Sequence, residues 1–330
     1  MQLYVADDSH AVALGHNAGM RSPSAAAPAR TVSPYLLLTL TPFLWACNWI
    51  VGRALSTSIP PMAMTFYRWL FAILILAPFA WPHLRHEWSI VWRNRRVMLL
   101  LGVVGVGSHN ALAYLGLNYT TAMNGVILNS FIPVMIIALS WIFLQQRLAT
   151  VQFAGVAVSL AGVLAILSQG SVEMLANFQV NRGDVFVILS MLLWSIYTIC
   201  LRWKPAGLHT LTFLFVIACI GDTGVLPFYL AEMAMGSTMT FTLINVLALL
   251  GVALFSSVLA YIFWNRGVEQ VGANVAGLFV HLMPVFGTIL AWLFLDERLH
   301  AYHIVGIALI LTGIYVTSRG AARVVAVPLE

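Results

Sequence analysis

Long apolar stretches follow one another along the chain, with only short polar connections between them. A helix needs about 20 apolar residues to cross the hydrocarbon core of a bilayer. The pattern predicts an all-α integral membrane protein with ten transmembrane helices, over residues 35–54, 60–81, 97–117, 121–144, 150–167, 184–203, 208–230, 243–265, 271–295 and 301–317. Residues 1–33 contain no comparable run, and their Ala, Pro and Ser content predicts a flexible tail.

Basic residues are distributed unevenly between alternate connections. If the amino terminus is cytoplasmic, the inside segments hold most of the Arg residues, among them Arg93 and Arg95, whereas the outside connections hold only Arg53, Arg182 and Arg298. Short connections rich in Lys and Arg remain in the cytoplasm. The pattern therefore predicts that both termini are cytoplasmic, with residues 319–330 as a second short tail, and that the protein lies in the bacterial inner (plasma) membrane.

The second half of the chain repeats the first. Three separate segments match in the same order: Leu44-Trp45 with Leu193-Trp194, Leu112-Ala113-Tyr114 with Leu259-Ala260-Tyr261, and the segment from Pro133 through Gly155 and Gly162 with that from Pro284 through Gly306 and Gly313. We therefore predict two repeats, residues 34–168 and 183–318. Because each contains five spans, an odd number, the second repeat is expected to have inverted topology. Two such repeats around a central cavity are typical of alternating-access transporters, although duplication is also a simple route to a large membrane protein.

Composition excludes several classes of protein. Hydrophobic residues make up 61% of the chain and charged residues 8%, whereas soluble domains carry about 25% charged residues. The net charge of +5 does not indicate nucleic-acid binding, because the basic residues are dispersed among the connections. Cys47, Cys200 and Cys219 all lie in apolar runs, which favours packing over disulfides or zinc. Since no nucleotide-binding loop, HExxH motif or paired-carboxylate site is found, we expect neither an enzyme nor a cofactor.

The repeated block resembles a known family motif. The block Pro284 … Glu297-Arg298-Leu299 … Gly306 … Gly313 is similar to that of the drug/metabolite transporter superfamily, in its ten-helix branch with two EamA-type repeats. The first copy departs from the motif, with Gln146 where the family commonly has Glu. The resemblance covers most of the chain and is strongest to bacterial exporters of amino acids, including aromatic ones. It implies a monomeric exporter of small molecules, with a cavity lined by both repeats.

Two charged side chains, Arg68 and Asp222, fall deep within predicted spans and not at their ends, and a charge at such depth costs roughly 2.5–3.5 kcal/mol on insertion scales. Arg68 is placed to bind a substrate carboxylate bidentately, or alternatively to snorkel outward and tie down helix ends. Asp222 lies at a similar depth. It is a candidate partner for Arg68, a proton acceptor for coupling, or a carboxyl group facing a water-filled vestibule.

Histidine occurs at two positions near the expected bilayer midplane, His109 and His281. Each is either a hydrogen-bonded interhelical residue or a substrate contact, and the pKa of imidazole also makes each a candidate for proton coupling. The spacings His83-x2-His86 and His300-x2-His303 are compatible with metal binding, but both pairs lie beside aromatic or basic residues at predicted interfaces. Interfacial anchoring is therefore the preferred interpretation, and no metal site is predicted.

Aromatic and uncharged polar residues complete the predicted substrate site. Trp45 and Trp194 occupy matching mid-span positions, where they form either flat cavity walls or core packing. The polar residues expected around them are Asn48, Tyr114, Asn129, Tyr197 and Tyr261. Such a cavity suits small amphipathic solutes.

Pro133 and Pro284 occupy the same place in the two copies of the repeated block. Each falls near the middle of its predicted span, 121–144 or 271–295. A proline inside a helix removes a backbone hydrogen bond and permits a bend. We therefore predict that both act as hinges.

These features together predict a secondary transporter that exports amino acids or related small metabolites by alternating access. A nucleotide-sugar or sugar-phosphate exchanger is an alternative within the same class, although a single intramembrane Arg is poorly suited to phosphates. A membrane scaffold or flippase subunit is the alternative from a different class.

Overall fold

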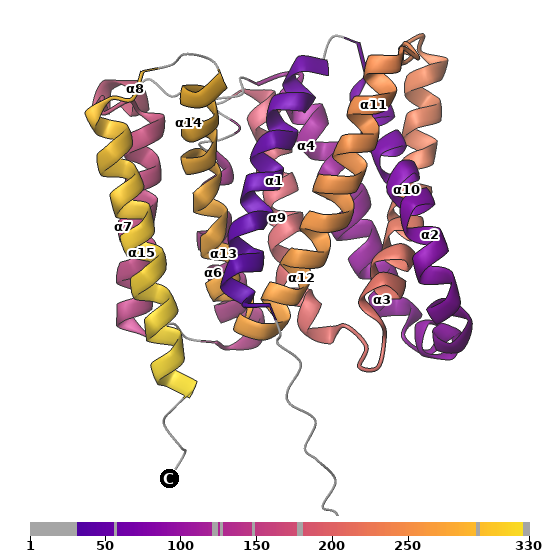
Figure 1. Cartoon of the computed structure of the whole chain (residues 1–330), viewed down its shortest axis with the longest axis horizontal. Coiled ribbons are helices and arrows are strands. Elements are labelled where there is room, and N and C mark those ends of the chain that lie inside the picture. The colour runs from indigo at the N-terminus through magenta and orange to yellow at the C-terminus, as the bar shows by residue number, and fades with distance from the viewer. Residues whose placement is uncertain are drawn as a thin grey trace, which may run out of the picture. The chain divides into compact units, whose positions relative to one another are not determined.

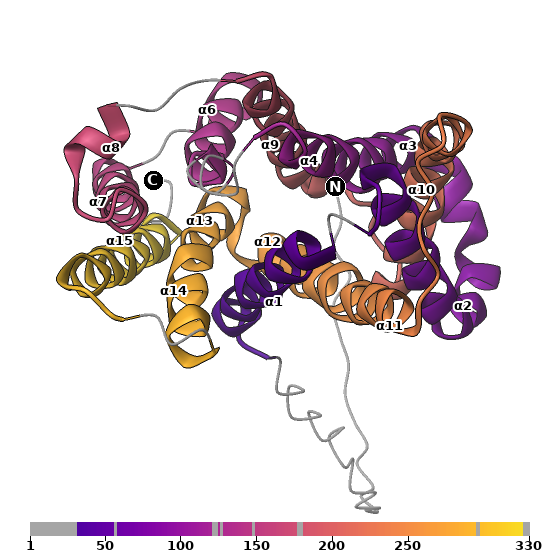
Figure 2. The same cartoon turned by 90° about the horizontal axis from the view of Figure 1, so that it is seen from above.

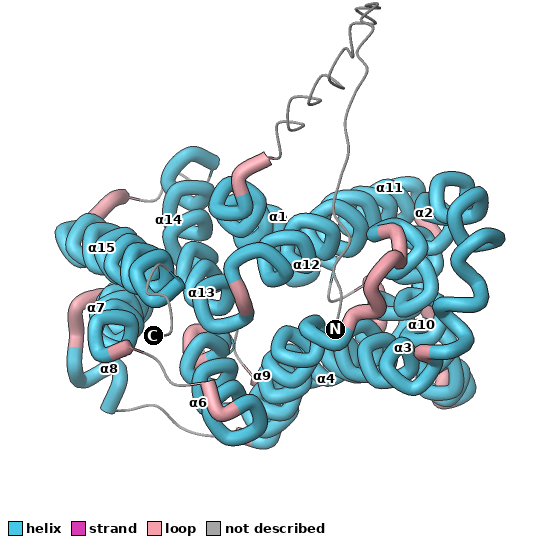
Figure 3. The backbone as a smooth tube through the Cα atoms, turned by 90° about the horizontal axis from the view of Figure 1, so that it is seen from below, coloured by secondary structure: helices cyan, strands magenta, loops and turns pink. Residues whose placement is uncertain are grey.

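The computed structural model describes residues 32–55, 58–120, 125, 128–146, 149–176, 181–294 and 298–325, and the regular elements among them are helices. The α-helices are α1 (Pro34–Leu55), α2 (Pro61–Arg93), α3 (Arg95–Gly102), α4 (His109–Leu117), α6 (Ile132–Leu144), α7 (Thr150–Leu167), α8 (Val172–Ala176), α9 (Arg182–Cys200), α10 (Thr210–Ala234), α11 (Leu243–Gly251), α12 (Ala260–Val271), α13 (Ala273–Leu278), α14 (Leu282–Phe294) and α15 (Ala301–Val325). Figure 1 shows them as a bundle, and Figure 3 shows how short the described loops between them are.

Nine of the described helical segments, some of them made of consecutive helices, are long and apolar enough to cross a membrane. The tenth predicted span, residues 121–144, contains α6, but residues 121–124 and 126–127 lie outside the described residues. The count of ten therefore stays a prediction, as does the tail predicted over residues 1–33, of which 1–31 are not described. At the other terminus α15 continues to Val325, so part of the tail expected from residue 319 is helical.

Helix α2 is longer than its apolar run predicts. The run ends near Trp81, but the helix continues through Pro82 to Arg93. A 33-residue helix is about 50 Å long, well beyond the roughly 30 Å hydrocarbon core. Its last turns carry Trp88 and Trp92, which are more than half exposed, as interfacial tryptophans are. Hydrophobicity therefore marked where the helix leaves the lipid rather than where it ends.

Two of these helical segments contain π-helical turns that the sequence did not predict. Val103–Ser108 joins α3 to α4, and Val252–Leu259 joins α11 to α12. Backbone hydrogen bonds in a π-turn run from residue i to i+5 and not to i+4. Within the first π-turn, the carbonyl of Gly105 also accepts a hydrogen bond of 2.7 Å from the hydroxyl of Tyr261 in the second repeat. Because π-helical turns frequently occur at functional sites, their presence in corresponding segments of both repeats directs attention to the region between these segments.

The two halves of the chain pack mainly on each other. Helix α1 contacts α12 and α14, α9 contacts α4 and α6, and α10 contacts α2 and α3. Viewed from above, α1, α4, α9 and α12 lie near the centre of the bundle, α2, α3 and α10 lie toward one end of its long axis, and α7 and α15 form a pair at the other end (Figure 2). The interior is consequently built from side chains of both repeats.

Helices α7 and α15 touch along their backbones. A Cβ atom built on Gly155 would lie 2.8 Å from the carbonyl oxygen of Gly313, and one on Gly162 would lie 2.6 Å from that of Gly306. Gly155 lies opposite Gly313, and Gly162, later in α7, lies opposite Gly306, earlier in α15, so the two helices run antiparallel. Small residues at such positions allow the close approach on which helix association in lipid depends.

The substitution Gly162→Ala is therefore expected to push α7 away from α15, and overpacking of this kind typically costs about 1–3 kcal/mol. We expect a lower midpoint of thermal unfolding for the detergent-purified variant. Gly287→Ala in α14 is the matched control, because a Cβ atom there meets nothing within 4 Å. An equal loss in both variants would show that the α7–α15 contact is not the cause.

Candidate functional site

A cavity of about 80 Å³ lies between the two repeats. A cavity needs at least about 10–15 Å³ to admit one water molecule, so this space is large enough for more than one. The lining residues come from both halves and are Trp45, Asn48, Gly52, Arg68, His109, Asn110, Ala113, Tyr114, Leu117, Asn129, Ile132, Trp194, Tyr261, Val280 and Met283. Eight of the ten residues predicted to bind substrate are in this set; Tyr197 and His281 are not.

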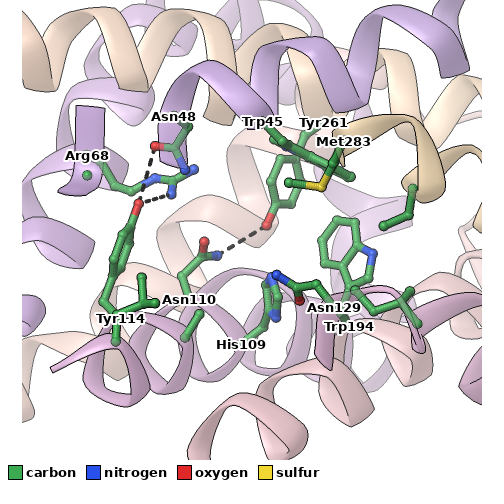
Figure 4. Close-up of a pocket in the computed structure, with 15 residues that line it drawn as sticks. Trp45, Asn48, Arg68, His109, Asn110, Tyr114, Asn129, Trp194, Tyr261 and Met283 are labelled. Atoms are coloured by element: carbon green, nitrogen blue, oxygen red, sulfur yellow. Dashed lines mark hydrogen bonds between the residues drawn. The ribbon is translucent and has the colours of Figure 1, made fainter. Parts of the chain in front are cut away.

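Arg68 is the charged group of the lining. Its side chain extends from α2, its Nε donates to the Ser257 hydroxyl at 2.9 Å, and its Nη1 donates to the Tyr114 hydroxyl at 2.7 Å. The Tyr114 hydroxyl in turn donates to Asn48 at 3.4 Å. Figure 4 shows Arg68, Tyr114 and Asn48 together on one side of the pocket. The guanidinium group is thus fixed by both repeats, while its Nη2 atom has no hydrogen-bond partner among the described residues.

The structure does not bring Arg68 and Asp222 together. Within the described part of the chain no carboxylate forms an ion pair with Arg68. Asp222 lies on α10 outside the pocket lining, is 5% exposed, and its Oδ1 atom has no described hydrogen-bond partner. The expectation that these two residues pair is therefore wrong for this conformation, and the role of Asp222 in proton coupling stays a prediction.

His109 faces the pocket with one ring nitrogen already bonded. Its Nδ1 atom lies 2.9 Å from the carbonyl oxygen of Ser190 and 2.8 Å from the hydroxyl of the same residue. A carbonyl oxygen can only accept, so the neutral ring carries its proton on Nδ1. The Nε2 atom, which no described residue contacts by a hydrogen bond, is then an acceptor. His109 is thus a hydrogen-bonded interhelical residue that also lines the cavity, and its contact with a substrate stays a prediction.

Tryptophan side chains form the other wall. The rings of Trp45 and Trp194 meet edge to face at 5.1 Å, and Trp264 lies 5.2 Å and 5.5 Å from them. Trp194 also lies 4.9 Å from the ring of His109. Trp45 and Trp194 therefore do both: they pack against each other and against Trp264, and they also line the cavity.

Asn110 is a lining residue that the sequence did not single out. Its Nδ2 atom donates to the carbonyl of Val106 at 2.9 Å and to the hydroxyl of Tyr261 at 3.2 Å. A signal for it was present, because Asn110-x3-Tyr114 in the first repeat corresponds to Ser257-x3-Tyr261 in the second. The repeated tyrosine is thus preceded by a polar residue one helical turn earlier in both copies.

The two predicted contacts outside the lining are fully buried. The hydroxyl of Tyr197 donates to Asn265 at 2.8 Å. His281 has both nitrogens occupied: Nε2 donates to the carbonyl of Ser130 at 2.8 Å, so Nδ1 accepts from the hydroxyl of Ser159 at 2.7 Å. Neither side chain offers a group to a solute in this conformation.

The two prolines lie in the first turns of their helices rather than in helix interiors. Pro133 is the second residue of α6, and Pro284 is the third residue of α14, directly after a 3-10 turn at Phe279–His281. Proline costs no helical hydrogen bond in a first turn. The chain already bends before each proline, and the His281–Ser130 hydrogen bond joins these two bends across 151 residues, the spacing of the repeat. Their action as hinges stays a prediction.

Metal ligands do not gather in the described part of the chain, where no group of three or more His, Cys, Asp or Glu residues is placed to hold an ion. The ring of His83 instead stacks on that of His209 at 4.0 Å. The backbone nitrogen of His300 donates to Nδ1 of His303 at 3.0 Å. Glu297, part of the repeated block, lies outside the described residues.

Comparison with known families identifies the fold. The model of the EamA-like transporter family matches residues 32–168 and again residues 181–319, which together make up most of the chain. The chain belongs to the EamA-like transporter family. It contains two copies of the family's repeat, and it is a multi-pass membrane transporter.

Relatives of this EamA-like transporter carry similar names. It is 29% identical to an uncharacterized transporter of Archaeoglobus fulgidus over 86% of this chain and 96% of that protein. It is 27% identical to the uncharacterized transporter YyaM of Bacillus subtilis, over 70% and 75% of the two chains. Protein PecM of Dickeya dadantii is 23% identical over 83% and 89%. A crystal structure with 17% identity aligns with a TM-score of 0.71 over 88% of this chain and 98% of that chain, which supports the fold alone.

The assignment of His281 as a structural residue of this EamA-like transporter can be tested with Ser159→Ala. The variant leaves Nδ1 of a buried imidazole without a partner, which typically costs about 1–3 kcal/mol. We expect a lower thermal midpoint than in Ser140→Ala, the control, because the buried hydroxyl of Ser140 has no described partner to lose. Equal midpoints would contradict the assignment.

Proposed function

We propose that this protein is a secondary transporter that exports amino acids or related small metabolites across the bacterial inner membrane by alternating access. The observation that carries the proposal is the pocket between the two repeats. It combines one guanidinium group without a carboxylate partner, one imidazole acceptor and a wall of indole rings.

The polar groups of the pocket match the ends of an amino acid. A carboxylate fits the Nη2 atom of Arg68, which the protein itself leaves unbonded. An ammonium group fits the Nε2 lone pair of His109, and the indole face of Trp194 adds cation–π attraction. The side chain would then lie against Trp45 and Met283. The small volume of the cavity, about 80 Å³, also favours a small solute.

The alternative as a nucleotide-sugar or sugar-phosphate exchanger is less well supported. A phosphate carries up to two negative charges, and Arg68 is the one cation of the described lining. Uncompensated charge in a low-dielectric cavity is costly. A scaffold or flippase subunit would not require a pocket with such placed polar groups, so this alternative is also less favoured.

The finer topology belongs to the same proposal: ten spans, an inverted second repeat, both termini in the cytoplasm and a monomer. The contacts of α7 and α15 support inversion, because helices that correspond in the repeat run antiparallel. Charge supports the orientation. The lower end of the bundle in Figure 1, where α1 begins, carries Arg93, Arg95, Arg202 and Lys204, whereas Arg182 and Arg298 lie at the upper end.

Transport is tested by counterflow of radiolabelled solutes in proteoliposomes, with a panel of neutral amino acids, their amines, their carboxylic acids and a nucleotide sugar. We expect accumulation of at least one amino acid and little of the nucleotide sugar. Arg68→Gln should reduce the rate for carboxylate-bearing solutes by at least tenfold, since a charged hydrogen bond is worth about 1.5–3 kcal/mol. Arg93→Gln, at the exposed end of α2, is the control. Counterflow of no panel member by the folded protein would overturn the proposal.

Orientation is tested with single cysteines in a background that lacks Cys47, Cys200 and Cys219. Ala206 and Ser237 are exposed at opposite ends of the bundle, in the loops before α10 and after it. We expect Ala206→Cys to react with an impermeant maleimide only in inside-out vesicles and Ser237→Cys only in intact cells. The reverse pattern would place both termini outside.

A further inference from the structure

The centre of the pocket is nearly symmetric. Trp45 and Trp194, Tyr114 and Tyr261, and Ile132 and Met283 occupy corresponding positions in the two repeats. Members of all three pairs line the cavity. These three pairs give the centre of the cavity similar side chains from both repeats, so the centre by itself does not favour either end of the bundle.

Away from the centre the symmetry fails. The next residues of the first repeat, Asn48, Gly52 and Leu117, line the pocket toward the upper end of the bundle, where α1 and α4 end. Their counterparts in the second repeat are Tyr197, Leu201 and Trp264, which are 0%, 1% and 0% exposed and line no part of this pocket. The pocket therefore extends in one direction only.

A compact layer closes the other direction. The Tyr197 hydroxyl bonds to Asn265 and so joins α9 to α12 across the path. The ring of Tyr197 lies against the π-turn at Gly105, where a Cβ atom would come within 2.1 Å of it. In the first repeat the counterpart of Asn265 is Asn118, which is exposed, and Asn48 bonds to Tyr114 instead. The contact that closes one side thus has no counterpart on the other.

A second cavity borders the parts of the chain that directly follow this layer in sequence, within residues 198–208 and 268–273. It has a volume of about 600 Å³ and includes Leu201, Arg202, Lys204 and Glu269 in its lining, at the lower end where basic residues gather. Lys204 and Glu269 form an ion pair at 2.7 Å, one or two turns beyond Tyr197 and Asn265 on the same two segments of chain. Charged groups from α12 and from the segment after α9 therefore meet at its rim.

We propose that Tyr197, Trp264 and Asn265 form the inner gate of the transporter, and that the 600 Å³ cavity is the vestibule through which solute reaches the pocket from the cytoplasm. The Lys204–Glu269 ion pair is the latch that holds the gate shut. This inference rests on the proposed alternating access. When the repeats exchange conformations, Tyr197, Leu201 and Trp264 become the lining, and Asn48, Gly52 and Leu117 become buried.

The test measures access from both sides with single cysteines in the background without native cysteines. Leu201→Cys reports on the inner side and Gly52→Cys on the outer side, where a Cβ atom makes an ordinary contact of 3.5 Å with Tyr114. Each is combined with Tyr197→Phe, which removes only the hydroxyl, or with Glu269→Gln, which breaks the latch. Glu173→Gln, an exposed carboxylate on α8, is the control.

We expect either gate variant to speed labelling of Leu201→Cys by a cytoplasmic impermeant thiol reagent about fivefold, since a net hydrogen bond is worth about 1 kcal/mol. Labelling of Gly52→Cys from outside should fall at the same time. Faster inner labelling with unchanged outer labelling would indicate local loosening and would overturn the proposal, as would no change in either. Glu269→Gln lies at the exposed rim, so it keeps the test open if Tyr197→Phe folds poorly.

Labelling requires no solute. Successful counterflow without reciprocal labelling would therefore contradict the gate alone, whereas reciprocal labelling without counterflow would contradict the proposed solutes.

Discussion

A charged guanidinium group within a membrane span is costly unless polar groups hold it, and here the protein supplies two of those groups itself. Arg68 meets this constraint by donating to Tyr114 of its own repeat and to Ser257 of the other. The two halves of the chain therefore have to meet around this side chain. The pocket, its polarity and the relative position of α2 and the π-turn at Val252–Leu259 all follow from that requirement. The Nη2 atom has no hydrogen-bond partner among the described residues, and in the proposed function it binds the carboxylate of the solute.

Buried polar groups elsewhere follow the same rule, and the rule explains the repeat interface. His281 bonds to the carbonyl of Ser130, the position that corresponds to it in the first repeat, and to the hydroxyl of Ser159. One imidazole thus joins the segments that precede Pro133 and Pro284. In lipid, where an unpaired carbonyl is costly, this contact stabilises both irregular segments at once.

The repeated sequence does not produce a symmetric molecule. Corresponding residues take different roles: Trp264 is buried against Trp45 and Trp194, while its counterpart Leu117 borders the pocket. The proposed alternating access requires such an asymmetry, because the two repeats would exchange these roles in the opposite state.

Long apolar runs were sufficient to predict a membrane protein, because lipid imposes the same length and composition on every span. Matching segments in the two halves predicted the two repeats, and the family comparison agrees. The sequence also led to most of the pocket residues, since polar groups and matched tryptophans at mid-span are rare enough to stand out. It could not predict the extension of α2 to Arg93, the π-turns, Asn110 in the pocket, or the burial of Tyr197 and His281. These depend on which helix faces which, and on whether a partner satisfies each polar group. Such pairings join residues 60 to 190 positions apart, so only the packed structure decided which polar side chains line the pocket and which bond to each other.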